Sequence, residues 1–85
     1  MKKMNRKEIV EKVIGCIVKV TGENDIQPDN EDIHLTNDLE IDSLDQVEIT
    51  MEVEQAFGIS IEDDEIRGFN TVADIVNLVE RKLED

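Results

Sequence analysis

Three stretches of the chain repeat apolar residues at the spacing of an α-helix, and this repeat is the strongest constraint on the fold. Residues 5–20, 43–57 and 72–83 each place apolar side chains three and four positions apart, which gives a helix one face that must be buried. Thr71 and Asp74 form a cap-like pair that opens the third stretch. The sequence therefore predicts an all-α fold, a small antiparallel bundle of three main helices plus one short helix.

Residues that start and end helices bound these stretches. Gly22 and Gly58 follow the first and second stretches, and glycine readily takes the left-handed conformation that ends many helices. Ser43 with Gln46 matches the capping box, in which two side chains three positions apart bond the first backbone N–H groups. We therefore expect Ser43 to be the N-cap of the second helix.

Two connections join the helices. Residues 21–42 include Asn24 and Pro28 and have no clear periodicity, so we expect a long loop between the first and second helices. Such loops are uncommon in compact domains unless they are functional. Residues 59–68 alternate too briefly for a strand and predict a bend, then a short helix near residues 62–67. The side chains expected to hold the connections on the core are Ile26, Ile33, Leu35, Leu39, Ile59 and Ile61.

Length and charge limit the classes of function. The 85 residues suit one domain, spanning 1–85, and 22 acidic residues against nine Lys and Arg give a net charge of −13. This charge argues against binding nucleic acid or anionic membranes. It favours partner proteins with basic patches, or it only keeps the protein soluble. The single cysteine, Cys16, allows no internal disulfide, and no long apolar run predicts a signal peptide or a membrane span. We expect a cytoplasmic monomer.

The second helix has two apolar faces when its residues are placed on a helical wheel. Leu44 and Met51 fall nearly opposite the side that we expect to be buried, and Val47 lies at the edge of that side. The predicted buried side consists of Ile49, Val53, Ala56 and Phe57. The acids around Leu44 and Met51 are Asp45, Glu48, Glu52 and Glu54. This outward face is either a docking surface for a basic, partly apolar partner or an ordinary solvated face.

Ser43 has a structural and a chemical interpretation. As an N-cap it would contribute about 1 kcal/mol, and Asp42 and Asp45 would suit the positive helix end. A hydrolytic nucleophile needs a general base, but His34 is the only histidine and the chain has no Gly-x-Ser-x-Gly turn. We therefore expect no catalytic residue.

The acidic residues that precede Ser43 partly match a calcium-binding loop. Asp38, Glu40 and Asp42 match positions 1, 3 and 5 of an EF-hand loop. Ser43 then stands where that loop requires glycine, and Ile49 stands where it requires glutamate. With no cluster of His or Cys for zinc, we expect no specific metal site, and weak cation binding by the clustered carboxylates stays open.

The stretch "DLEIDSLDQVEITMEVEQAFGISI" (38–61) resembles the acyl carrier proteins around their Asp-Ser-Leu motif, and the resemblance extends over nearly the whole chain. It implies that Ser43 carries a covalent 4′-phosphopantetheine, transferred from coenzyme A by a Mg²⁺-dependent phosphopantetheinyl transferase that Asp42 contacts. It also implies that acyl groups travel as thioesters on the arm in fatty acid biosynthesis. The outward face would then dock onto basic patches of fatty acid synthase or related acyl-processing enzymes.

One position departs from that family. The acyl carrier proteins usually have glycine two positions before Asp-Ser, and this chain has Glu40. Glycine eases the turn into the helix, so Glu40 makes the approach bulkier and more acidic. Beside a carrier in fatty acid biosynthesis, two alternatives stay open. The departure at Glu40 allows a specialised carrier of the same fold for polyketide, aminoacyl or lipid-modifying chemistry. The interpretation of Ser43 as only an N-cap allows an unmodified acidic interaction module.

Overall fold

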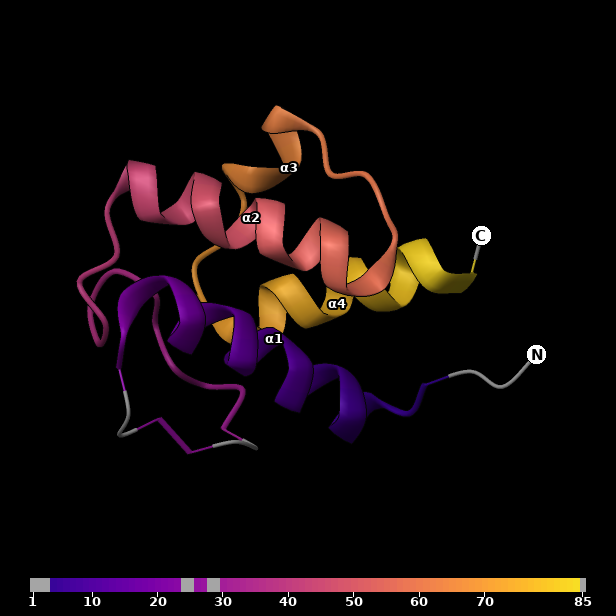
Figure 1. The fold of residues 1–85 in the computed structure, drawn as a ribbon, viewed down its shortest axis with the longest axis horizontal. Helices are drawn as coiled ribbons and strands as arrows, with labels where there is room; N and C mark the ends of the chain where they lie inside the picture. Colours follow the sequence, from indigo (N-terminus) through magenta and orange to yellow (C-terminus); the bar gives the residue numbers. More distant parts are fainter. Residues whose placement is uncertain (1–3, 24–25, 28–29, 85) are drawn as a thin grey trace.

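The computed structural model describes residues 4–23, 26–27 and 30–84, and it confirms the predicted all-α fold (Figure 1). α1 runs antiparallel to both α2 and α4, and the short α3 lies beyond α2 (Figure 1). Within the described residues there is no strand, only an isolated bridge between His34 and Thr71. The helices are α1 (Arg6–Thr21), α2 (Ser43–Phe57), α3 (Asp63–Ile66) and α4 (Val72–Glu84).

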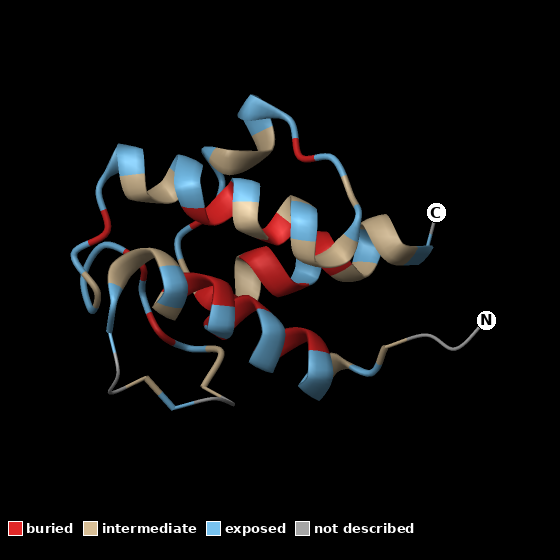
Figure 2. Ribbon diagram, in the orientation of Figure 1, coloured by how far each residue is buried: buried red, intermediate tan, exposed pale blue. Residues whose placement is uncertain are grey.

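The core lies between α1, α2 and α4, whose buried residues face one another (Figure 2). It is almost entirely aliphatic, with Phe69 as its one buried aromatic residue among those described. Close packing of branched aliphatic side chains from three helices is the main source of stability for a domain of this size. The largest side chains with almost no exposure are Ile9, Ile17, Leu35, Ile49 and Ile75.

The predicted helix ends are confirmed at both glycines, and α2 spans the predicted residues 43–57, but the predicted N-cap of α2 is wrong. Gly22 and Gly58 take left-handed backbones, with φ of 77° and 67°. The N-cap of α2 is Asp42, whose Oδ1 accepts a hydrogen bond from the backbone N of Asp45 at 2.9 Å. Ser43 is therefore the first helical residue rather than the cap. Aspartate caps a helix as well as serine does, and the cap lies one residue earlier than the capping box suggested.

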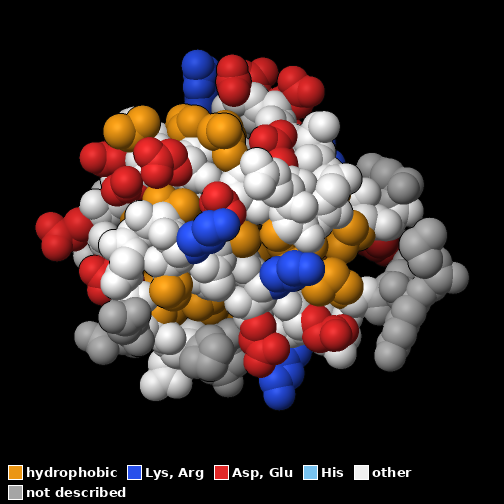
Figure 3. Space-filling model, in the orientation of Figure 1, with side chains coloured by type: hydrophobic (Ala, Val, Ile, Leu, Met, Phe, Trp, Pro, Cys, Tyr) orange, Lys and Arg blue, Asp and Glu red, His pale blue; other side chains and the backbone are white. Residues whose placement is uncertain are grey.

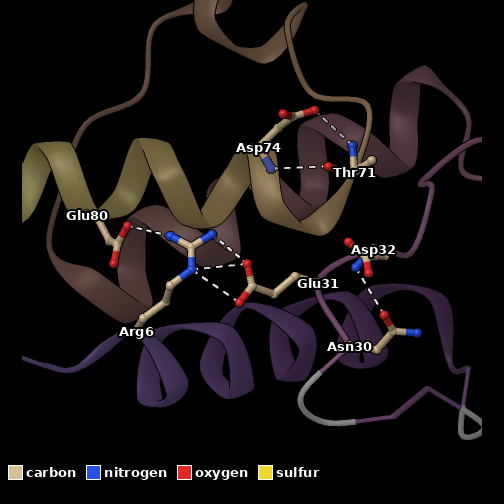
Figure 4. Close-up of polar contacts among 7 residues, drawn as sticks. All are labelled: Arg6, Asn30, Glu31, Asp32, Thr71, Asp74 and Glu80. Atoms are coloured by element: carbon tan, nitrogen blue, oxygen red, sulfur yellow. Dashed lines mark hydrogen bonds and ion pairs between the residues drawn. The ribbon is translucent and has the colours of Figure 1, made fainter.

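The second half of the long loop packs along the start of α4. Its backbone N–H and C=O groups make three hydrogen bonds with residues 70–73: Leu35 N to Asn70 O at 2.9 Å, Val72 N to Ile33 O at 3.0 Å and Ala73 N to Glu31 O at 3.0 Å. The bonds from Val72 and Ala73 satisfy N–H groups that the first turn of a helix leaves unpaired. Thr71 and Asp74 complete the helix start as predicted, since each side chain accepts from the other's backbone N (Figure 4).

The predicted attachments of the loop are confirmed. Ile33 and Leu35 are buried, and Ile26 and Leu39 are partly buried against the core. Ile41 is buried as well, which the sequence analysis did not predict. Asn24 and Pro28, which also entered the loop prediction, lie outside the described residues.

The connection after α2 is a bend followed by a single helical turn. Ile61 is buried as expected, Ile59 is only partly buried, and α3 is shorter than the predicted 62–67. Glu65 ties this turn to α4, because its carboxylate lies 3.1 Å from Lys82 Nζ and 3.3 Å from Arg81 Nη2. A hydrogen bond from Glu62 N, together with Lys82, lowers the pKa of Glu65.

Candidate functional site

The approach to α2 is a tight turn that ends in a left-handed residue. Asp38 N donates to His34 O and Glu40 N donates to Thr36 O, both at 3.0 Å, and Glu40 has a φ of 53°. Among the described residues it is the only one other than glycine with positive φ. A side chain in this conformation costs on the order of 1 kcal/mol, which glycine avoids. The position where the sequence departs from the acyl carrier family is therefore one where the backbone favours glycine.

Ser43 lies three residues after Glu40, at the exposed first position of α2. Because Asp42 makes the capping bond, the Ser43 hydroxyl has no hydrogen-bond partner within the described part of the chain. The N-terminus of a helix carries a partial positive charge and unpaired N–H groups, which favour an anion such as a phosphate. An exposed, uncommitted hydroxyl at this point fits the attachment of a phosphodiester.

The outward face of α2 carries three exposed apolar side chains. Leu44 is 66% exposed, Val47 is 45% exposed and Met51 is 54% exposed. Leu44 and Met51 were predicted to face outward, whereas the wheel had placed Val47 at the edge of the buried side. Hydrophobic and acidic side chains lie interspersed over the first half of this helix (Figure 3). We call Leu44, Val47, Glu48 and Met51 the outward face.

The acidic residues around this face differ in what they contact. Glu48 is exposed, and Asp45 is partly buried. Glu52 pairs with Lys19 of α1 at 3.1 Å, and Glu54 Oε2 accepts a hydrogen bond from Ile61 N at 2.8 Å. Glu48 is thus the acid most available to a partner, while Glu52 and Glu54 also hold neighbouring segments in place.

A shallow hollow of about 250 Å³ lies beside the outward face, between α1 and α2. Met51 and Glu48 line it from α2, and Lys19 and Val20 line it from α1. Because apolar and charged side chains both line the hollow, the surface open to a partner continues from Met51 toward α1.

Other site chemistries find little support in the structure. The described residues contain no group of three or more His, Cys, Asp or Glu placed to hold a metal ion. His34 is exposed, and its backbone N donates to Asp38. Cys16 is buried, and that burial raises the pKa of its thiol, which disfavours the reactive thiolate. No helix in the described part of the chain has the length and apolar character needed to cross a membrane.

Comparison with known proteins gives the family. Residues 11–79 match the family model described as "Phosphopantetheine attachment site". An acyl carrier protein of Thermotoga maritima is 38% identical over 79 residues, which cover 93% of this chain and 96% of that protein. This chain belongs to the acyl carrier protein family. Members of the family carry a covalently attached 4′-phosphopantetheine, and so does this acyl carrier protein.

The fold of this chain agrees with that of a solved member of the family. The crystal structure of the Thermotoga maritima acyl carrier protein superposes with a TM-score of 0.81 at 28% identity, covering 99% of this chain and 96% of that one. A relative with a narrower name is the meromycolate extension acyl carrier protein of Mycobacterium leprae. It is 34% identical over 84 residues, which cover 96% of this chain and 70% of that protein.

Proposed function

We propose that Ser43 carries the 4′-phosphopantetheine and that this acyl carrier protein works in fatty acid biosynthesis. The observation that supports the assignment to Ser43 is its exposed hydroxyl at the first position of α2, which Asp42 leaves free by making the capping bond itself. The thiol at the end of the arm supplies the thioester chemistry.

The residues around Ser43 bind and orient but do not catalyse. The N–H groups at the start of α2 stabilise the phosphodiester charge, and Asp42 fixes the turn and lies where a transferase and its Mg²⁺ would approach. No histidine has a role here, so the base that activates the Ser43 hydroxyl comes from the phosphopantetheinyl transferase. The chain is a non-catalytic carrier.

Intact mass tests the attachment site. The chain is incubated with coenzyme A, Mg²⁺ and a broad-specificity phosphopantetheinyl transferase. We expect a gain of one phosphopantetheine in the parent and none in Ser43→Ala. Ser60→Ala is the matched control, because Ser60 is the only other serine and is also exposed. Modification that persists in Ser43→Ala would refute the assignment. An unmodified parent, beside a known carrier that is modified, would favour the acidic interaction module.

The outward face is the proposed docking surface for acyl-processing enzymes with basic patches. Its apolar side chains would enter a partner's groove, and its acids would pair with Lys and Arg. The proposed docking surface comprises the outward face and the acids beside it. To the six residues predicted from the sequence, which are Leu44, Asp45, Glu48, Met51, Glu52 and Glu54, the structure adds the exposed Val47.

Two substitutions test this surface, and both leave the core intact. Glu48→Lys and Met51→Ala should weaken binding to such an enzyme at least several-fold, with the unfolding free energy changed by no more than about 0.5 kcal/mol. Binding should also fall steeply with salt. Glu11→Lys is the charge-matched control, because Glu11 is exposed on α1. An equal loss of affinity in Glu11→Lys would show that net charge, rather than this surface, controls binding.

A specialised carrier for another pathway is the second candidate. The meromycolate extension relative supports it, because the family includes carriers named for narrower pathways. The mass of the acyl group that Ser43 carries in cells separates the two: ordinary fatty acyl intermediates favour the first, and another class of acyl group favours the second. A monomer in the cytoplasm remains the prediction for either.

A further inference from the structure

Arg6 joins three segments that are far apart in the sequence. It is the first residue of α1, and its guanidinium lies between Glu31 of the loop and Glu80 of α4 (Figure 4). Arg6 Nε donates to both carboxylate oxygens of Glu31, at 3.1 and 3.2 Å, and the two terminal nitrogens reach Glu31 and Glu80. These hydrogen bonds from Arg6 lower the pKa of the Glu31 carboxyl.

Besides the Arg6 contact, the segment that contains Glu31 is held by the buried side chains of Ile33 and Leu35 and by backbone hydrogen bonds. Residues 31–35 meet residues 70–73 through the three hydrogen bonds described above, and each of them joins the loop to the start of α4. At the far end of the segment, Ile41 N donates to Leu35 O at 3.0 Å, just before Asp42 and Ser43. The segment 30–41 therefore forms one strip between the Arg6 contact and the serine.

We propose that Arg6 is a clasp that holds the 30–41 segment closed over the start of α4, and that the segment opens as a unit when the clasp is released. The sign of the charges is the reason. With Arg6 in place, one cation attracts two carboxylates; without it, Glu31 and Glu80 face each other as like charges in a chain of net charge −13. Loss of one side chain turns an attraction between the loop and α4 into a repulsion.

Opening of this strip would have a local and a functional result. It would expose Ile33 and Leu35, the side chains that the strip itself buries in the core, and would free the turn that sets the approach to Ser43. The ion pairs are about one-third exposed, so salt screens them. The clasp thus makes the conformation of the loop sensitive to ionic strength.

Amide hydrogen exchange tests the clasp directly. The backbone N–H groups of Leu35, Val72 and Ala73 donate across the strip, so they report its opening. In Arg6→Met, these three amides should exchange about fivefold faster, the change expected when a partly exposed ion-pair network is lost. The amides of Val13 and Val53, within α1 and α2, should be unchanged. Arg81→Met, which breaks the ion pair to α3, is the matched control and should leave the three reporters unchanged.

Three further measurements keep the inference open to refutation. Adding Glu31→Gln to Arg6→Met should slow the reporters again, because it removes the repulsion. If Arg6→Met does not fold, Glu31→Gln alone should still raise the exchange rates of the three reporter amides, while the amides of Val13 and Val53 stay unchanged. The ratio of exchange rates between variant and parent should shrink as salt rises. Uniform acceleration of all amides, unchanged reporters, or a ratio that salt does not alter would each overturn the clasp.

Discussion

Two residues with left-handed backbones flank α2, and they differ in type. Gly58 follows the helix with φ of 67°, and Glu40 precedes it, at the end of the turn, with φ of 53°. The backbone demand is similar at both positions, but only the later one is met by glycine. Glycine suits the left-handed backbone after the C-terminus of α2. Before the N-terminus, Glu40 keeps a side chain in that conformation at a cost in stability.

The neighbours of these two residues differ in the same way. Near the C-terminus of α2, Glu54 bonds the backbone of Ile61 and so secures the next connection. At the N-terminus, Asp42 is committed to capping, but the Ser43 hydroxyl and the Glu40 side chain are exposed. A region that leaves polar groups uncommitted and accepts strain is typical of a functional site rather than of a stabilising one. Substitutions on each side of α2 test this contrast.

Gly58→Ala should give the largest effect. A Cβ at Gly58 would meet no other atom within 4 Å, so the cost arises from the backbone alone. We expect the unfolding free energy to fall by about 1–2 kcal/mol, measured by denaturant unfolding followed by circular dichroism. An unchanged value would mean that the helix end relaxes freely, and the contrast with Glu40 would lose its basis.

Asp42→Ala should cost about 1 kcal/mol, because it removes the side-chain acceptor for Asp45 N. The same denaturant unfolding measures it. Asp42→Asn is the control, since asparagine keeps an acceptor and should restore most of the loss. Equal losses in both variants would indicate that the carboxylate charge, rather than the cap, stabilises this end.

Glu40→Gly should act in the opposite direction. Glycine relieves the left-handed strain, although it also loosens the unfolded chain, so we expect a net gain of about 0.5 kcal/mol in unfolding free energy. Glu40→Ala keeps a Cβ in the strained conformation and is the control that should show no gain. If Glu40→Gly destabilises the protein, the glutamate side chain makes a stabilising contact that outweighs the strain.

Ser43→Ala should have the smallest effect on stability, within about 0.3 kcal/mol, because the hydroxyl has no partner among the described residues. From the sequence alone, the loss of an N-cap worth about 1 kcal/mol was expected. Comparing its unfolding free energy with that of Asp42→Ala decides which residue caps the helix. A loss as large as that of Asp42→Ala would restore the serine as the cap.

Much of this fold could be predicted because the stabilising pattern is local. Helical repeats of apolar residues located α1, α2 and α4, and Gly22 and Gly58 marked two of their ends. The bounds of α2 agree with the predicted 43–57, but its N-cap could not be predicted, because Asp42 and Ser43 are adjacent and both cap helices well. The exposure of Val47 also depends on how neighbouring segments pack around α2, which the helical wheel of one helix does not contain.

The contacts that join distant segments were beyond the sequence for a different reason. Arg6 lies 25 residues from Glu31 and 74 residues from Glu80, and nothing in the spacing of charges selects these pairs among 22 acids and nine bases. The left-handed backbone of Glu40 is likewise set by the nested hydrogen bonds of the turn, since glutamate has no preference for that conformation. The family resemblance indicated the position only because glycine is usual there.

The burial of Cys16 has a practical consequence. Its thiol is shielded within α1 and held in its protonated form, so alkylating reagents should react with it only when the chain opens. It is also the only cysteine in the protein. The thiol at the end of a phosphopantetheine arm on Ser43 would therefore be the only one that reacts. A fluorescent maleimide would label each carrier whose arm is free of an acyl group, and no residue of the chain would have to be changed.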